Sequence, residues 1–255
     1  MKLYFLGTCA GTEPMKDRKH ASFALECGET LYWFDAGEGC SYTGHNMGLD
    51  LLKVRKIILS HTHYDHIGGL PNLLMNIRKL KSVRKVEAIP PIDIYTPNRS
   101  VWETILELIH YKECTFKDRY PLITHDVADG HLFDDGTVRV TALHNNHVMP
   151  VDEKWMSYSF LIEAEGKRLV YSGDVKAYEE LDPLIGSGCD GIIIETGHHK
   201  IDDVYFFTKD RNVGRIFFFH NGREILYDTK GCEKRVSELF RGRAVITYDT
   251  MTVTL

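Results

Sequence analysis

Residues 61–66 read HTHYDH, so three imidazoles and one carboxylate fall within six positions. The preceding residues 56–59 form a short, largely apolar run that is typical of a buried strand. The following residues include Gly68, Gly69 and then Pro71, which favours the first turn of a helix. Imidazole nitrogens and carboxylate oxygens are ligands of divalent zinc, iron and manganese. The segment therefore predicts a metal site on a turn between a strand and a helix.

Further metal ligands are expected at the ends of other apolar runs. His147 follows the run 138–143, Asp174 follows 168–171, and His220 follows 216–219. His144 competes with His147, because both histidines come after the same run. One short cluster cannot supply two metal ions by itself, so these distant residues are the candidates that would complete a two-metal site.

Strand and helix patterns recur in both halves of the chain. Alternation and short apolar runs predict strands at 2–6, 22–26, 31–34, 56–59, 92–95, 138–143, 157–163, 168–171, 191–195, 215–219 and 244–248. Helical spacing predicts helices from Pro71 to about residue 80, over 101–109, between 195 and 215, and around 236–240. Periodicity alone indicates an α/β chain with one domain, and a length of 255 residues suits a single large core.

The motif H-x-H-x-D-H after a strand resembles the signature of the metallo-β-lactamase superfamily of hydrolases. MKLYFLGT at 1–8, Gly11, Arg18, WFDAGEG at 33–39 and SHTHYDHIGGLP at 60–71 resemble the ribonuclease Z and arylsulfatase-like branch. This resemblance extends along the whole chain. It implies an αββα sandwich, two sheets face to face with helices outside, formed as a single domain over residues 1–255.

The resemblance also implies a set of site residues and favours His147 over His144. One metal would be held by His61, His63 and His147, the other by Asp65, His66 and His220, with Asp174 as the bridge between them. Asp65 and one of His198 and His199 would be the catalytic residues, because the branch places a histidine near the metals after the strand 191–194. Asp35 would support the metal loop through hydrogen bonds.

The chemistry that this resemblance implies is hydrolysis with two divalent metal ions. Zinc suits the ligands best, and iron and manganese are the alternatives. A hydroxide bridging the metals would attack a phosphodiester or a similar small ester. His63 stands where the oxygen- and NO-reducing relatives carry glutamate, which favours hydrolysis over redox chemistry. The alternatives are a tRNA 3′-processing endoribonuclease of the ribonuclease Z type and a metal-binding scaffold without catalysis. The scaffold is disfavoured because candidates stand at all seven ligand positions.

Charge and composition bear on the partners. The formal net charge is −5, and the one basic run, 78–85, is expected to be the solvated end of a helix. A small-molecule ester is therefore preferred over nucleic acid, and 82–120 is expected to hold ordinary helix and strand without a tRNA-clamping arm. No apolar run approaches the roughly 20 residues of a membrane span. Six scattered cysteines are expected to be free thiols in a cytoplasmic protein. A homodimer is compatible with these features.

Overall fold

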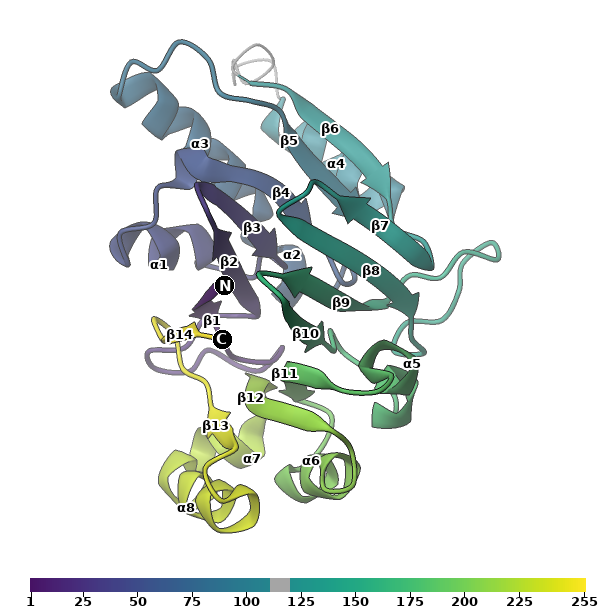
Figure 1. Ribbon diagram of the computed structural model, residues 1–255. Helices are drawn as coiled ribbons and strands as arrows, with labels where there is room; N and C mark the ends of the chain where they lie inside the picture. Colours follow the sequence, from purple (N-terminus) through teal and green to yellow (C-terminus); the bar gives the residue numbers. More distant parts are fainter. Residues whose placement is uncertain (111–119) are drawn as a thin grey trace.

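The structure is a computed structural model that describes residues 1–110 and 120–255. Two seven-stranded sheets pack face to face, with helices on the outside (Figure 1). The first sheet runs in the order β14 (Thr252–Thr254), β1 (Lys2–Gly7), β2 (Ser22–Cys27), β3 (Thr30–Phe34), β4 (Val54–Ile58), β5 (Ile92–Thr96) and β6 (Leu122–Asp126). The second runs β13 (Ala244–Ile246), β12 (Val213–Asn221), β11 (Cys189–Thr196), β10 (Lys167–Tyr171), β9 (Tyr158–Ala164), β8 (Val138–His144) and β7 (Gly130–Asp134).

The helices fall into two groups along the chain. The group that follows strands of the first sheet is α1 (Cys40–Asn46), the 3-10 turn η1 (Leu51–Lys53), α2 (Tyr64–Ile67), α3 (Leu70–Val83) and α4 (Arg99–Ile109). The second group is the 3-10 turn η2 (Tyr178–Leu181), α5 (Asp182–Ile185), α6 (Ile201–Thr208), α7 (Arg223–Tyr227) and α8 (Thr229–Phe240). Among the described residues, no helix is long and apolar enough to cross a bilayer.

Alternation along the strands builds three apolar layers. In β1, Leu3 and Phe5 lie in the core between the two sheets, whereas Tyr4 and Leu6 face the helices outside the first sheet. Successive side chains of a strand point to opposite faces, so a strand buried on both faces feeds two cores. The second sheet does the same, with its outer face packed against a cluster that includes Phe240 of α8. The predicted αββα sandwich is confirmed.

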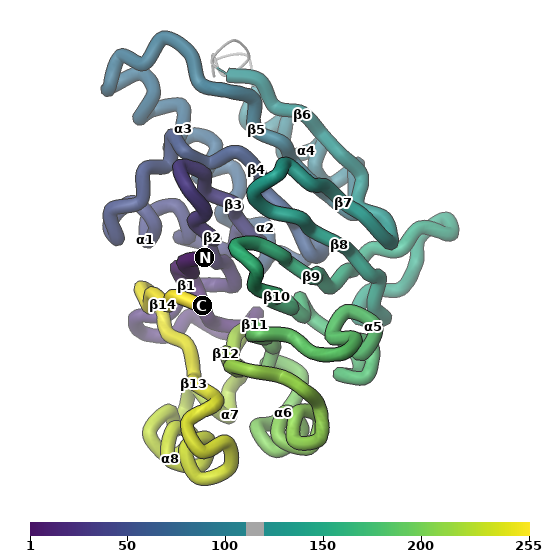
Figure 2. The backbone as a smooth tube through the Cα atoms, in the orientation of Figure 1, coloured from purple at the N-terminus to yellow at the C-terminus, as the bar shows by residue number. Residues whose placement is uncertain are grey.

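The structure differs from the sequence prediction mainly at the sheet edges. Strands β6, β7 and β14 and the short helices α1 and α2 were not predicted. The three strands are short and show at most one buried residue each, so their apolar signal is weak. The last of them returns beside the first strand, where Thr254 pairs with Lys2 (Figure 2). The segment 82–120, predicted to lack a tRNA-clamping arm, lies partly outside the described residues. Cys114 also lies outside them, and the other five cysteines are free and buried.

One edge of the sandwich collects the candidate site residues. Strands β3, β4 and β5 are parallel to one another in the first sheet, and β10, β11 and β12 are parallel in the second. Parallel strands end at the same edge of a sheet, so residues that follow them meet there. Asp35 follows β3, His61 follows β4 and Asp174 follows β10, while Glu195 and His220 lie near the ends of β11 and β12.

Candidate metal centre

The first histidine cluster owes its shape to a short helix after β4. His63, the residue directly before α2, has an extended backbone, and His61 lies two residues before it. Asp65 and His66 lie within α2, where the His66 backbone N–H donates to the His63 carbonyl at 3.0 Å. The sequence prediction of a single turn leading into the helix at Pro71 is therefore corrected, because α2 forms its own turn before α3 begins at Leu70.

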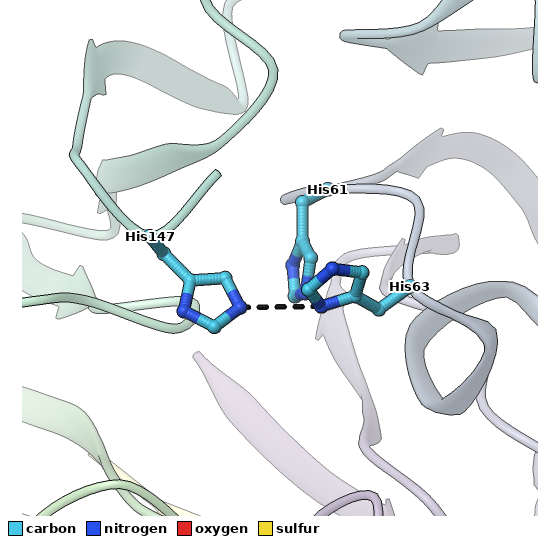
Figure 3. A group of neighbouring side chains, drawn as sticks. All are labelled: His61, His63 and His147. Carbon is cyan, nitrogen blue, oxygen red and sulfur yellow. Dashed lines mark hydrogen bonds between the residues drawn. The ribbon is translucent and has the colours of Figure 1, made fainter. Parts of the chain in front are cut away.

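Three imidazoles converge from two different sheets. The Nδ1 atom of His63 lies 3.0 Å from His61 Nε2 and 3.2 Å from His147 Nε2 (Figure 3). His147 reaches this point from the loop after β8, whereas the other two come from the loop after β4. A neutral imidazole offers one donor and one acceptor nitrogen, so three nitrogens facing one small volume suit a cation better than a set of mutual hydrogen bonds.

A second group lies beside the first. His220 Nε2 is 3.0 Å and His66 Nε2 is 3.6 Å from Asp65 Oδ2. His220 occupies the extra position of a β-bulge, since Glu195 pairs with Phe219 and Thr196 pairs with Asn221. Its φ of 49° is a strained, left-handed value for a histidine, and such strain is often held at functional sites. From this bulge the His220 side chain reaches Asp65 of α2.

Asp174 touches both groups of side chains. Its Oδ2 lies 3.8 Å from His61 Nε2, 3.6 Å from His147 Nε2 and 3.4 Å from His220 Nε2. Its Oδ1 lies 3.3 Å from His66 Nε2. All seven residues that the sequence proposed as ligands thus come together at one edge of the sandwich, with the Asp174 carboxylate between the two groups.

The chemistry of these side chains fits divalent metal ions. His66 Nε2 and Asp174 Oδ1 are both fully buried and lie 3.3 Å from one another, and neither makes a hydrogen bond of normal geometry to the described residues. A buried polar atom without a partner is costly, and it is expected only where a ligand completes it. Three His/Asp groups drawn from the seven residues can each place their ligand atoms within 4.8 Å of one another. The donor set of imidazoles and carboxylates matches zinc, iron or manganese.

The pKa values of the clustered histidines shift in opposite directions. Burial, together with the neighbouring imidazoles of His66 and His147, lowers the pKa of His61 well below its usual value, so its ring is neutral. Burial likewise lowers the pKa of His147 to about 4. For His220, burial opposes charging, but the carboxylates of Asp174, Asp65 and Glu195 together outweigh it and raise the pKa to about 9. The carboxylates around His220 thus favour a positive charge at this position, as they would favour a bound cation.

Asp35 fixes the His66 ring through a contact with Nδ1. Its Oδ2 lies 2.8 Å from His66 Nδ1 and accepts hydrogen bonds from the Tyr171 hydroxyl at 2.5 Å and the Ser60 hydroxyl at 2.7 Å. Its Oδ1 accepts from the Ser60 backbone N–H at 2.7 Å. With its Nδ1 proton held by Asp35, His66 would present the lone pair of Nε2 to a metal ion. Sequence reasoning expected Asp35 in this place and missed Tyr171, which only the second sheet brings near.

The structure separates the two histidines after β11. The His198 ring lies 4.8 Å from the His147 ring and 5.6 Å from the His220 ring, centroid to centroid, and its Nδ1 lies 3.0 Å from Glu195 Oε1. The carboxylate of Glu195, which is buried, raises the pKa of His198 through this hydrogen bond. The His199 ring instead packs on Tyr178 and its Nε2 lies 3.0 Å from the Val175 carbonyl. His198 therefore borders the cluster and His199 faces away.

His144 lies outside the cluster. Its Nδ1 is 2.6 Å from Asp129 Oδ2, and its ring stacks on Trp155 at 4.0 Å between centroids. Although His144 and His147 follow the same strand, β8 ends at His144, and the three residues after it carry the chain across to His63.

Comparison with solved structures identifies the class of fold. Human short-form tRNase Z superposes with a TM-score of 0.75 at 21% identity, covering 100% of this chain and 99% of that one. The metallo-β-lactamase fold protein YhfI from Bacillus subtilis superposes with a TM-score of 0.73 at 18% identity, covering 99% of both chains. This protein therefore has the metallo-β-lactamase fold, as its sequence motifs predicted.

Sequence comparison then gives the family. Residues 1–198 match the family model of the anti-Pycsar protein Apyc1, and the chain belongs to that family. Ribonuclease Z from Shouchella clausii is 34% identical over 170 residues, covering 66% of this chain and 49% of that protein. Ribonuclease BN from Cronobacter sakazakii is 33% identical over 175 residues, covering 66% and 51%. The chain thus matches about half the length of these curated relatives.

Replacing Asp35 should weaken metal retention without removing a ligand. We expect Asp35→Asn to lower zinc affinity by about 10- to 100-fold, because the amide is a poorer acceptor for the His66 Nδ1 proton. Competition with a chromogenic chelator measures the affinity. Asp129→Asn is the matched control, since it alters a His–Asp pair outside the cluster. Equal zinc affinity in Asp35→Asn and the wild type would contradict this support role.

Proposed function

We propose that this protein is a hydrolase that uses two divalent metal ions to cleave a phosphodiester or a similar small ester. The observation that carries the proposal is the Asp174 carboxylate lying between two converging groups of ligand atoms. His61, His63 and His147 would hold one ion, and Asp65, His66 and His220 the other. Zinc fits this donor set best, with iron or manganese as alternatives.

Such a metal pair, when bound, supplies Lewis acidity and hydroxide at neutral pH. The chain's own residues supply the rest of the reaction. The buried Asp174 carboxylate provides the negative charge that two close dications require, and the Asp35–His66 hydrogen bond fixes the orientation of one ligand ring. The anionic substrate oxygens would be drawn to this centre, although the protein as a whole is acidic.

His198 is the residue that we assign to proton transfer. Its Nδ1 is held by Glu195, which leaves Nε2 to carry the proton that the leaving-group oxygen needs. The ring is partly exposed, so substrate can reach it. This arrangement of carboxylate, imidazole and substrate oxygen is typical of a general acid whose tautomer is fixed by a neighbouring group.

Ribonuclease Z activity is the second candidate, and the curated relatives favour it by name. Two features of this chain argue against it. The net charge is −5, and the basic run 78–85 lies on the C-terminal part of α3 and the residues just after it. Within that run Arg84 pairs with Asp50, and Lys81 donates to the Glu87 carbonyl. A non-catalytic scaffold is the weakest candidate, because no ligand position has been lost.

Metal analysis tests the dinuclear centre. We expect saturated protein to hold two divalent ions per chain, and Asp174→Ala to lose both together because a bridging ligand serves both sites. Inductively coupled plasma mass spectrometry after gel filtration gives the stoichiometry. His144→Ala, outside the cluster, should retain the wild-type metal content. A wild-type stoichiometry that never exceeds one would rule out the dinuclear centre.

The two neighbouring histidines form a matched pair of variants. His198→Ala should reduce turnover by about 10²–10⁴-fold with unchanged metal content, the usual contribution of a general acid. His199→Ala should retain most activity, because its ring points toward Val175 and Tyr178. Turnover of an aryl phosphodiester, measured beside metal content, is the test. Wild-type turnover in both single variants would contradict the assignment of His198 to proton transfer.

The substrate proposal rests on charge. Each phosphate that a protein neutralises contributes about 0.7–0.9 to the slope of log affinity against log salt. An acidic chain with one partly paired basic run supplies few such contacts, so we expect cleavage of a small aryl phosphodiester and poor cleavage of precursor tRNA. The comparison uses both substrates at physiological salt. Efficient, position-specific removal of a tRNA 3′ trailer, with negligible activity on the diester, would favour ribonuclease Z activity instead.

A further inference from the structure

A cavity of about 720 Å³ lies on the described surface, within the range of about 300–1,000 Å³ usual for small-molecule sites. It is bounded by the start of α4, the connection between β6 and β7, and residues 151–156. Tyr158, which lines it, donates its backbone N–H to the carbonyl of Ser60, the residue before His61. Pro97, another lining residue, follows β5, the strand next to β4. The cavity therefore adjoins the strand ends that carry the metal ligands.

The aromatic side chain of Trp155 lines the cavity in a fixed position. The Trp155 ring stacks on His144 with centroids 4.0 Å apart and an angle of 12° between the planes. Asp129 fixes His144 twice, with Oδ1 2.7 Å from the backbone N–H and Oδ2 2.6 Å from Nδ1. The Trp155 ring is thus held in place before any ligand arrives. Trp33 and Trp102 are buried in the core, whereas Trp155 is partly exposed.

The rim of the cavity is acidic. Arg99 and Asp126 neutralise one another in an ion pair at 2.9 Å. The remaining charged residues among the described lining are Lys154 and four carboxylates, Glu103, Asp129, Asp152 and Glu153. A negative rim repels anions and leaves uncharged groups unaffected. The metal cluster would attract an anionic phosphoryl group, so the two neighbouring regions differ in the charge that they accept.

Two of these carboxylates stand on a rigid turn. Val151 and Lys154 exchange backbone hydrogen bonds of 2.9 Å in both directions, and Asp152 and Glu153 between them have φ values of 47° and 63°. Two central residues with positive φ define a type I′ turn, which normally prefers Asn-Gly. Glutamate is poorly suited to this conformation. Aspartate is common at the first central position of such a turn, whereas Glu153 stands where glycine is favoured, which indicates a role for the Glu153 side chain.

We propose that this cavity binds the organic group of the substrate and selects an uncharged, flat aromatic group over one that carries a further anionic group. The proposal rests on the phosphodiester hydrolysis proposed above. The face of Trp155 offers a stacking surface to the aromatic group, and its fixed position reduces the entropy lost on binding. The acidic turn at Asp152 and Glu153 repels a second anion. The selectivity thus comes from residues that contact neither metal nor phosphoryl group.

Binding without phosphate tests the cavity independently of catalysis. The probes are 2-naphthol and 6-hydroxynaphthalene-2-sulfonate, which differ by one weakly coordinating anionic group, titrated calorimetrically into metal-loaded protein. We expect wild-type protein to prefer 2-naphthol by about 3- to 30-fold, the range that one or two partly screened charges provide. Trp155→Ala should weaken 2-naphthol binding by about tenfold, while Trp155→Phe stays close to wild type.

The charge effect has a variant that preserves the turn. Asp152→Asn combined with Glu153→Gly gives the sequence that type I′ turns prefer, so it removes both charges and keeps the hairpin. It should reduce the preference for 2-naphthol to within about twofold, because the local repulsion is lost. Glu233→Gln with Glu238→Gln, on the exposed face of α8, removes the same charge elsewhere and should leave the preference unchanged.

The same variants are then compared on aryl phosphodiesters whose leaving group is neutral or sulfonated. Asp152→Asn with Glu153→Gly should raise kcat/KM for the sulfonated ester relative to the neutral one by about 3- to 30-fold. If no phosphodiester is cleaved by wild-type protein, the proposed function fails while the binding titrations still test the cavity. Unchanged 2-naphthol affinity in Trp155→Ala, or an unchanged charge preference in the turn variant, would overturn the cavity assignment.

Discussion

The buried carboxylate of Asp174 is the constraint on which the arrangement of the molecule depends. It is 2% exposed, and ring nitrogens of His61, His66, His147 and His220 surround it at 3.3–3.8 Å. An ionised carboxylate is costly to bury unless opposite charge or hydrogen bonds compensate it. His61 and His66 come from the first sheet and the other two from the second, so this compensation exists only when the two sheets meet at the same edge.

Strained backbone accompanies this edge. Asp35 and His220 have φ values of 51° and 49°, each at or directly after a strand end. A left-handed conformation costs a residue with a side chain about 1–2 kcal/mol, so it persists only where surrounding contacts fix it. Asp35 is fixed by the Ser60, His66 and Tyr171 hydrogen bonds, and His220 by a bulge within paired strands. The convergence of ligand atoms at one point therefore requires backbone conformations that cost conformational stability.

Charge is distributed unevenly around the centre. The cluster gathers imidazoles that would receive divalent cations and, through them, a phosphoryl group. The adjoining cavity has an aromatic wall and an acidic rim, and the whole chain carries a net charge of −5. A substrate that suits both regions has one anionic centre and an uncharged remainder. On the function proposed above, a long polyanion would suit the cluster but not its surroundings, so a fold shared with tRNase Z need not imply the same substrate.

Resemblance to the metallo-β-lactamase superfamily supplied the αββα arrangement and the assignment of the seven ligands. The sequence by itself determined the central strands, an α/β class and the His and Asp candidates that follow apolar runs. Those signals are local: an apolar run of period two marks a buried strand, and a His or Asp directly after it marks a strand end. The edge strands β6, β7 and β14 were not predicted, because partly exposed strands lack that alternation. Only the tertiary structure decided between His198 and His199, brought Tyr171 to Asp35 and formed the cavity beside Trp155. Each of these depends on how residues distant in the chain are oriented against one another. Strand pairing and bulges set that orientation, and the spacing of residues along the chain does not encode it.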